Sequence, residues 1–356
     1  MPAIAQRQAT YRKLAAWGLS AALLAALFVW VEWRSVIAAL RRAEPAWLGA
    51  AAGLFALTVF FRGLRFALLL QRFAKCRVGA AGGLDLASIS GLFNQLLPLR
   101  LGELAFVFLS TFSHRAPADR GLLVLLAARL YDVLAMLLLA AFGLLWWPRL
   151  AASGWAYVVG AACMILGVVA LRLDIAIRLG QSAIGWLLGA TPLRDKALGR
   201  KLLAFCARLA EGSAAFRQPR SVAINLSFAL GIWMTLEASF FAAIRAFVPD
   251  IQLADVMVGA VGAGLASLLP VNAAGSLGTL EAGWTLGFAA LGVARADALA
   301  SAIAMHVVVL GVYALLAGLA AWRLGRATWE EFNAWRRGDR PEPIATAGVR
   351  GASEVR

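Results

Sequence analysis

Two apolar stretches of this chain are interrupted in the same way, and the match restricts the possible fold more than any other feature. The first, residues 96–104, reads LLPLRLGEL, and the second, residues 268–281, reads LLPVNAAGSLGTLE. Proline removes a backbone donor and glycine loosens a helix, so we expect structural breaks at Pro98, Gly102 and Pro270. Broken backbone and charge survive at membrane depth only inside protein or beside a watery cavity. Matching breaks in two halves of a chain indicate a transporter binding site.

The composition is that of an integral membrane protein. Of 356 residues, 62% are hydrophobic, and the mean hydropathy is +0.78, whereas a soluble domain is about half apolar. The net charge of +15 comes from basic residues between the apolar runs, where such residues orient a chain and meet anionic lipid headgroups. We therefore expect membrane lipids as partners and no nucleic acid. The isolated Cys76, Cys163 and Cys206 form neither a metal-binding spacing nor a disulfide framework.

Apolar runs of about 20 residues predict membrane-spanning helices, and the chain holds six: 14–31, 46–70, 121–147, 155–171, 221–247 and 297–322. The broken segments 84–112 and 255–292 lie between them, and each has the length of two half-helices. We predict an all-α polytopic membrane protein with about six full spans plus two re-entrant helical hairpins, or eight membrane segments. It forms a single integral membrane domain over residues 1–325.

The distribution of charge predicts the topology. Basic residues precede the first span, so the N-terminus is placed in the cytoplasm and loop 32–45 outside. Loop 172–220, with nine Lys and Arg against three acids, is then a basic cytoplasmic loop if both broken segments are hairpins. The acidic loop 248–255 falls outside, and residues 326–356 form a polar cytoplasmic tail with a short amphipathic start. The two termini are therefore both cytoplasmic.

Under this topology the halves, about 14–147 and 155–322, run in opposite directions through the membrane, as in an inverted-topology repeat. When Pro98 is aligned with Pro270, Arg65 aligns with Glu237, because each lies 33 residues before its proline. This alignment of two charges could also arise by chance.

Ionisable residues inside spans are candidates for function, because burial of each charge costs a few kcal/mol. The candidates are Arg65, Arg100, Glu103, Arg129, Asp132, Glu237, Glu281 and His306. Spacings of three residues would also allow Arg100–Glu103 and Arg129–Asp132 to be structural ion pairs, and Arg65, like Arg62, could extend to the membrane surface.

His306 is either a packed histidine or, with Glu281, a protonatable group in a coupling pathway. Gly275 and Gly278 follow the second proline break, where free N–H groups at a helix start would suit a phosphate; glycine could also serve helix packing.

Several activities lack their sequence signals. There is no GxxxxGK[ST] loop for ATP and no acidic pair in an external loop for a metal-dependent sugar or prenyl transferase. We therefore expect no enzyme activity, no cofactor and no metal.

Four motifs resemble the lysylphosphatidylglycerol synthase transmembrane family, also called the flippase-like domain family, over about residues 30–325. This family includes the membrane half of the multiple peptide resistance factor and hopanoid-associated relatives. Its Pro-x-Arg-x-Gly-Glu motif matches residues 98–103, its Gly-x-x-Gly-x-x-Glu motif residues 275–281, and its Arg-x-x-Arg-aromatic stretch residues 62–66. Its Glu-Arg-x-x-Asp motif is matched in part by 128–132, where Ala128 replaces the Glu, and Phe106 stands at a frequent Arg position.

The resemblance implies a lipid flippase of the bacterial inner membrane that moves an anionic phospholipid or a polyprenyl-phosphate lipid between leaflets. One alternative is a non-transport component or enzyme partner of envelope-lipid biosynthesis, acting on hopanoids, aminoacyl lipids or glycolipids. Another is an interaction scaffold that docks partners on loop 172–220. A lipid-biosynthesis partner at the cytoplasmic face and a homo-oligomer are compatible with each.

Overall fold

The computed structural model describes residues 33–97, 101–146, 173–189, 203–208, 218–268 and 278–336, with the single positions 158, 161, 164, 165 and 211. All regular structure within these ranges is helical. The elements are α2 (Trp33–Arg42), α3 (Pro45–Leu69), the π-helical turn η1 (Leu70–Ala74), α4 (Ala80–Leu96), α5 (Gly102–His114), α6 (Ala118–Trp146), α9 (Leu173–Gly189), α11 (Pro219–Arg245), α12 (Leu253–Leu268), α13 (Thr279–Ala289) and α14 (Arg295–Arg336).

Three helices in the described ranges are long and apolar enough to cross a membrane: Pro45–Ala74, Pro219–Arg245 and Arg295–Leu324. They coincide with the predicted spans 46–70, 221–247 and 297–322. The predicted span 121–147 corresponds to α6, which has 29 residues. The predicted span 14–31 and most of 155–171 lie outside the described residues.

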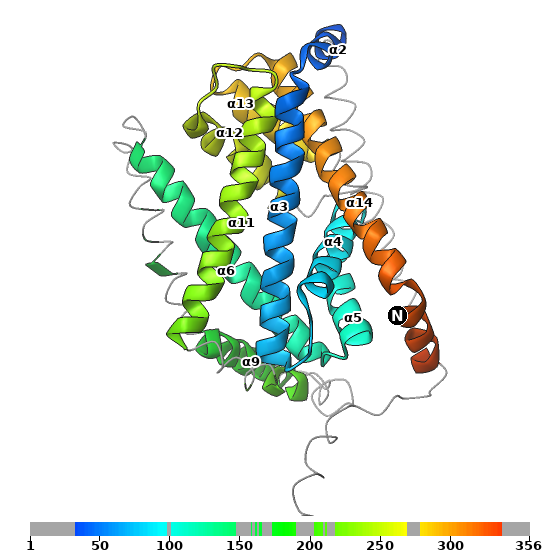
Figure 1. Ribbon diagram of the computed structural model, residues 1–356. Coiled ribbons are helices and arrows are strands. Elements are labelled where there is room, and N and C mark those ends of the chain that lie inside the picture. Colours follow the sequence, from blue (N-terminus) through cyan, green and yellow to red (C-terminus); the bar gives the residue numbers. More distant parts are fainter. Residues whose placement is uncertain are drawn as a thin grey trace, which may run out of the picture.

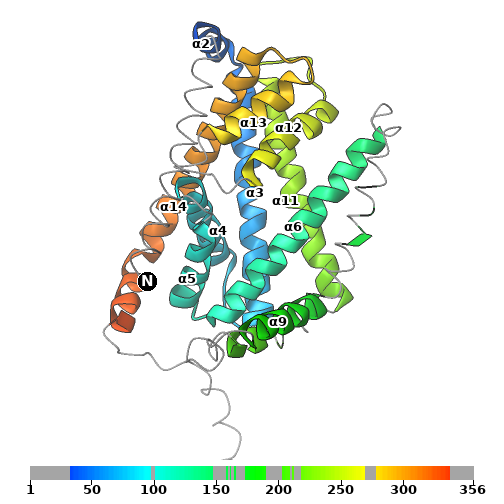
Figure 2. The same cartoon turned by 180° about the vertical axis from the view of Figure 1, so that it is seen from behind.

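Each broken segment forms two short helices rather than one long one. Segment 84–112 holds α4 and α5, and segment 255–292 holds α12 and α13. Within each pair the two helices pack against one another. Figures 1 and 2 show that α4 and α5 lie in the half of the molecule nearer α9, whereas α12 and α13 lie in the half nearer α2. The two pairs therefore occupy opposite halves of the molecule.

Helices α3 and α11 run antiparallel along the centre of the molecule (Figure 1). Hydroxyl groups join them: Thr58 Oγ1 donates to Thr235 Oγ1 at 2.9 Å, and Ser239 Oγ donates to the Ala51 carbonyl at 2.9 Å. Small and hydroxylated residues are typical of membrane helix interfaces, because helices there associate through close packing and hydrogen bonds rather than through the hydrophobic effect.

Three segments predicted as loop or tail contain helix. Segment 32–45 holds α2, and segment 172–220 holds α9, which lies across the end of the bundle (Figure 2). Helix α14 continues to Arg336, ten residues past the predicted tail start at Arg326. The apolar runs in these segments are too short to span a membrane. Their apolar and charged residues alternate in a pattern that is sufficient for an amphipathic helix.

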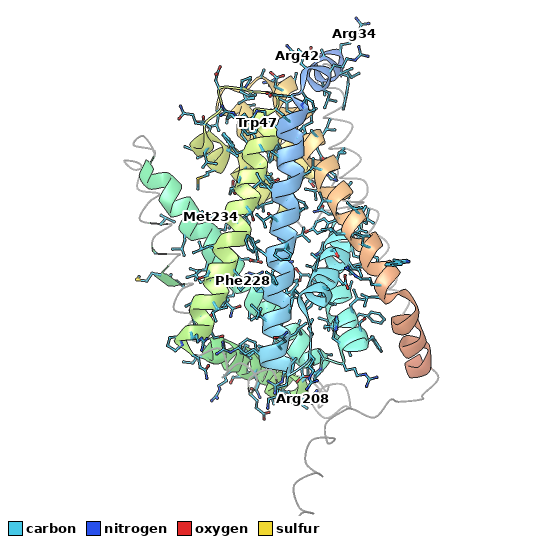
Figure 3. All side chains as sticks on the ribbon, in the orientation of Figure 1. Arg34, Arg42, Trp47, Arg208, Phe228 and Met234 are labelled. Atoms are coloured by element: carbon cyan, nitrogen blue, oxygen red, sulfur yellow. The ribbon has the colours of Figure 1, made fainter. Side chains whose placement is uncertain are left out.

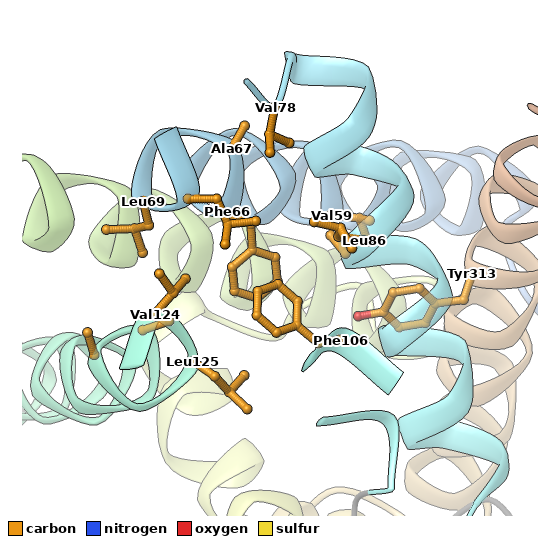
Figure 4. Packing of buried hydrophobic residues seen from close by; sticks show 14 of the residues in the cluster. Val59, Phe66, Ala67, Leu69, Val78, Leu86, Phe106, Val124, Leu125 and Tyr313 are labelled. Carbon is orange, nitrogen blue, oxygen red and sulfur yellow. The ribbon is translucent and has the colours of Figure 1, made fainter. Parts of the chain in front are cut away.

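The largest apolar core joins α3, α4, α5, α6, α11 and α14. Phe66 of α3 meets Phe106 of α5 with ring centroids 4.4 Å apart, and Tyr313 of α14 approaches the same region, as Figure 4 shows. Helices α3 and α4 come unusually close at two glycines. A Cβ added to Gly83 would lie 2.1 Å from the Gly63 carbonyl oxygen. This contact places the charged face of α3 against the first broken segment.

Large apolar side chains also face outward. Met234, Val307 and Leu315 are each at least 60% exposed, and Figure 3 shows Met234 and Phe228 along α11. Arg42 and Trp47 mark the α2 end of the bundle and Arg208 the opposite end (Figure 3). An apolar belt between two polar ends is the surface expected of a protein surrounded by lipid.

Candidate functional site: a charged pocket between α3, α4, α5 and α6

Four helices of the first half converge on a narrow charged pocket. It has ≈ 370 Å³ of empty space, part of it open to solvent, but only ≈ 20 Å³ can hold the centre of a water molecule. The volume fits about one water, so the pocket is closed to a headgroup in this conformation. Its polar lining consists of Arg62, Arg65, Ser90, Asn94, Glu103, Arg129 and Asp132.

Arg65 and Asp132 form a two-pronged ion pair in the pocket. Arg65 Nη1 donates to Asp132 Oδ1 at 2.7 Å and Nη2 to Oδ2 at 3.1 Å. Both side chains are buried, with 2% and 9% exposure, so Arg65 does not extend to the membrane surface. Arginine and carboxylate match in this two-pronged geometry, which ties α3 to α6.

Arg129 links the two carboxylates of the pocket. Its Nη2 lies 2.9 Å from Glu103 Oε1, and its Nη1 lies 3.9 Å from Asp132 Oδ2. The predicted three-residue pair Arg129–Asp132 is therefore present, but Asp132 is held more closely by Arg65. Arg129 is 40% exposed and Glu103 29%, so this end of the pocket is more exposed than the Arg65–Asp132 end.

The pocket carries excess positive charge. Arg62, Arg65 and Arg129 face Glu103 and Asp132, leaving one guanidinium in excess. Arg62 Nη1 donates to Tyr313 Oη at 2.8 Å, while the Nε atoms of all three arginines are buried without a partner. Unsatisfied buried donors favour an acceptor-rich ligand, and an anion with several oxygens has the right chemistry.

The second half holds a buried acid–base pair. His306 Nδ1 of α14 lies 2.7 Å from Glu281 Oε1 of α13, and both side chains are 6% exposed. Glu281 Oε2 accepts the Gly278 N–H at 2.6 Å. Gly278 has φ +90°, a conformation that favours glycine. Its N–H is therefore bonded to Glu281, and is not the free phosphate donor that the sequence led us to expect there.

The two halves repeat one arrangement. In the first, an acid in the first turn of α5, Glu103, contacts a base on the following long helix, Arg129 on α6. In the second, an acid in the first turn of α13, Glu281, contacts His306 on α14. Each half thus pairs a short helix with a long one in the same order, whereas the inverted-topology repeat itself stays a prediction.

The other predicted residues are distributed as follows. Glu237 lies on α11, with Oε2 buried and without a partner. Gly102 begins α5, where a Cβ would lie 2.1 Å from the Ser90 carbonyl oxygen. Pro98, Arg100, Pro270 and Gly275 lie outside the described residues, so the predicted Arg100–Glu103 pair is not placed.

Sequence reasoning missed two polar contributions. Ser90 and Asn94 of α4 line the pocket, and Arg323 of α14 pairs with the buried Asp85 of α4. Asp85 was detectable, because a carboxylate at the edge of an apolar segment needs a partner. Ser90 and Asn94 carry no charge and no motif, so only the packing of α4 against α5 identified them.

The sequence matches a known protein family. Residues 15–317 match the family described as the lysylphosphatidylglycerol synthase TM region. Comparisons with curated proteins and with solved structures gave no match. Because the family match covers most of the chain, including both broken segments and both acid–base pairs, this protein belongs to the lysylphosphatidylglycerol synthase transmembrane family.

Proposed function

We propose that this protein is a lipid transporter of the bacterial inner membrane, which moves a phosphate-bearing lipid between leaflets without enzymatic chemistry. The ligand is an anionic phospholipid or a polyprenyl-phosphate lipid. Its acyl or prenyl chains stay in the bilayer while the headgroup crosses through the bundle. Membership of a family of lipid-related membrane domains supports the class of substrate.

The observation that carries the proposal is the pocket of three arginines and two carboxylates between α3 and α6. Arginine binds phosphate in the same two-pronged manner as carboxylate. A phosphate can therefore replace Glu103 on the exposed Arg129 and then compete for Arg65. The closed pocket is one end state, because its carboxylates occupy the positions that a phosphate takes in the loaded state.

The arrangement of the helices supports alternating access. In our proposal α4–α5 and α12–α13 are re-entrant hairpins from opposite faces, and the halves form an inverted repeat, with full spans between them. The end formed by η1, α9 and the start of α11 is cytoplasmic. The described side chains there include Arg72, Lys75, Arg77 and Arg115, in agreement with the positive-inside rule. In this proposed topology both chain termini are cytoplasmic.

The Glu281–His306 pair is the proposed coupling element. Glu281 and His306 lie buried and 2.7 Å apart, and His306 Nε2 is buried without a partner. Proton movement through this pair in the second half would bias the equilibrium between the two access states. The drive is then the proton gradient.

The test is a two-sided leaflet assay in proteoliposomes, with fluorescent anionic, zwitterionic and polyprenyl-phosphate lipids. Arg129→Gln removes the exposed guanidinium of the pocket and is expected to reduce crossing by about tenfold, the loss of a charge-assisted hydrogen bond. Arg208→Gln is the matched control, because Arg208 is also half-exposed and paired with an acid, Asp119, at 3.6 Å, but lies outside the pocket.

Selective crossing of one lipid class, lost in Arg129→Gln and kept in Arg208→Gln, supports transport. Equal crossing in both variants and in protein-free vesicles contradicts it. In that case, lipid analysis of cells that lack the protein would decide whether it serves lipid biosynthesis instead.

A further inference from the structure

A second cavity, with polar groups set in a largely apolar wall, lies between η1 and the start of α11. It has ≈ 660 Å³ of empty space including its solvent-open part, and ≈ 280 Å³ can hold the centre of a water molecule. It is therefore far roomier than the charged pocket. We call it the α3–α11 groove; its lining residues are Arg65, Leu68, Leu69, Gln71, Arg72, Ser221, Ile224, Asn225 and Phe228.

The groove is built by a local widening of the helix. After Leu69 the chain makes a π-helical turn, and Lys75 N–H bonds the Leu70 carbonyl five residues back. Such turns are uncommon and frequent at functional sites. Gln71 and Arg72 sit in this turn and line the groove. Arg72 Nη2 donates to Gln218 Oε1 at 2.6 Å, so the turn is tied to the residue that precedes α11.

Two buried polar groups of the groove lack partners. Ser221 is 1% exposed and Asn225 2%, yet Ser221 Oγ and Asn225 Oδ1 make no hydrogen bond. Asn225 Nδ2 donates to the Ser221 carbonyl at 2.8 Å, which leaves Oδ1 as an acceptor that needs a donor. A buried polar atom without a partner is unfavourable and uncommon. A ligand that supplies a hydroxyl group would satisfy it.

The charge of the groove defines the rest of the ligand. Two guanidinium groups and no carboxylate line it. Asp132 neutralises Arg65, whereas Arg72 makes no ion pair with a carboxylate among the described residues. A phosphate therefore fits Arg72, and the donor for Asn225 must be neutral rather than an ammonium group, which Arg72 would repel. Leu68, Ile224 and Phe228 provide an apolar wall for lipid chains.

We propose that the α3–α11 groove binds the headgroup of a phosphate lipid that carries hydroxyl groups. Arg72 holds the phosphate and Asn225 accepts a hydroxyl hydrogen bond. Arg65 lines both the groove and the charged pocket, so the groove loads the pocket once Arg65 exchanges Asp132 for the phosphate. This loading role rests on the proposed transport function, whereas binding to the groove is tested independently of it.

The experiment is calorimetric titration of the purified full chain in detergent with short-chain lipids. Dihexanoyl-phosphatidylglycerol offers a phosphate and hydroxyl groups, dihexanoyl-phosphatidylcholine offers a phosphate without donors, and dihexanoyl-phosphatidylethanolamine offers an ammonium group. We expect the first to bind at least about tenfold more tightly than the other two, the factor of one hydrogen bond. Glycerol 3-phosphate distinguishes a free phosphate ligand from a lipid, and is expected to bind more weakly because it leaves the apolar wall empty.

The variants locate the contact. Asn225→Leu is expected to weaken phosphatidylglycerol binding about tenfold and to leave phosphatidylcholine binding unchanged, whereas Arg72→Gln weakens both. Ser221→Ala is a milder second probe of the same wall, in case Asn225→Leu does not fold. Arg178→Gln, on the exposed face of α9 at the same end, is the control and should bind as the wild type does.

The outcomes separate the two sites. Arg72 and Asn225 line only the groove and Arg129 only the charged pocket, so a loss of binding in Arg72→Gln or Asn225→Leu points to the groove. If Asn225→Leu weakens both lipids equally, or Arg72→Gln weakens neither, the groove is not the headgroup site. If binding depends on Arg72 and Asn225 while wild-type proteoliposomes move no lipid, the groove stands and the proposed transport function falls.

Discussion

Arg65 and Asp132, 67 residues apart in the chain, form a two-pronged ion pair with N–O distances of 2.7 and 3.1 Å. The pair joins the central helix α3 to α6; Arg65 lines both the charged pocket and the α3–α11 groove, and Asp132 lines the pocket. A buried pair of this kind is weak evidence for stability, because desolvation offsets much of the attraction. Because Arg65 borders two cavities, the exchange of its partner Asp132 for a ligand tells more about the pair than its contribution to stability does.

Removing one partner of this pair should destabilise the protein strongly. Asp132→Asn leaves Arg65 buried without its counter-charge, and we expect a loss of about 3–5 kcal/mol in the free energy of unfolding. The double variant Arg65→Met, Asp132→Leu should recover most of the stability by replacing the pair with apolar packing, but should not move lipid. Thermal unfolding in detergent and the leaflet assay measure the two effects. A double variant that transports normally would show that the pair is purely structural.

Glu103 should act as a competitor of the phosphate. Its pair with Arg129 is partly exposed, so Glu103→Gln should change stability by less than about 1 kcal/mol. Because Arg129 is then permanently available, lipid should saturate transport at lower concentration while the maximal rate falls. Initial rates of lipid crossing at several lipid fractions test this. Asp119→Asn breaks the pair with Arg208 instead. This variant should change neither the lipid concentration at which transport saturates nor the maximal rate.

The start of α5 depends on glycine. In Gly102→Ala the new Cβ would lie 2.1 Å from the Ser90 carbonyl oxygen and 2.5 Å from the Asn94 backbone nitrogen, so α5 must move away from α4. We expect a loss of about 1–3 kcal/mol from this overpacking, seen as a lower melting temperature. Gly53→Ala is the control, since nothing lies within 4 Å of its Cβ. That variant should be neutral or slightly stabilising.

Hairpin topology predicts the side from which introduced cysteines react. In a cysteine-free background, Ala81→Cys and Ala118→Cys flank α4–α5 at exposed positions and should both react with an impermeant maleimide from the cytoplasmic side. Gln252→Cys and Ala294→Cys flank α12–α13 and should both react from the outside. Labelling of inside-out and right-side-out vesicles makes the comparison. Flanks of one pair that react from opposite sides would mean a single crossing.

Proton coupling predicts a specific loss in Glu281→Gln. Glutamine can still accept the Gly278 N–H bond at the start of α13, but it carries no exchangeable acid proton at neutral pH. Lipid crossing in this variant should therefore become insensitive to an imposed pH gradient while passive exchange persists. Wild-type rates with and without the gradient give the reference. An undiminished gradient response in Glu281→Gln would remove this pair from the coupling pathway.

The native Cys76, which lies outside the spans, has a predicted maleimide reactivity that bears on the labelling experiment. It follows η1 and is half-buried, and burial raises the pKa of its thiol. The thiolate is the reactive form, so Cys76 should react with maleimide more slowly than an exposed cysteine at neutral pH. For this reason the topology experiment uses introduced cysteines rather than the native one.

The sequence determined the class, the positions of three long helices and the two breaks, but not the helices α2 and α9 in segments predicted as loops. Spans 46–70, 221–247 and 297–322 agree within a few residues with helices long enough to cross a membrane, because a run of about 20 apolar residues has few alternatives to a helix in lipid. It also identified Glu103, Arg129, Asp132 and Arg65 as unusual, since a charge in an apolar run stands out wherever it points.

Only the tertiary structure decided the partners. Spacing along one helix favoured Arg129 for Asp132, yet α3 delivers Arg65 from 67 residues away at a closer distance. Likewise, the Gly278 N–H bonds Glu281. The uncharged Ser221 and Asn225 become candidate ligand-binding residues only because the fold places them beside Arg72 in the groove. The physical reason is that burial and pairing depend on which helix faces pack together. The periodicity of the sequence determines on which face of its own helix a side chain lies. It does not determine which other helix packs against that face.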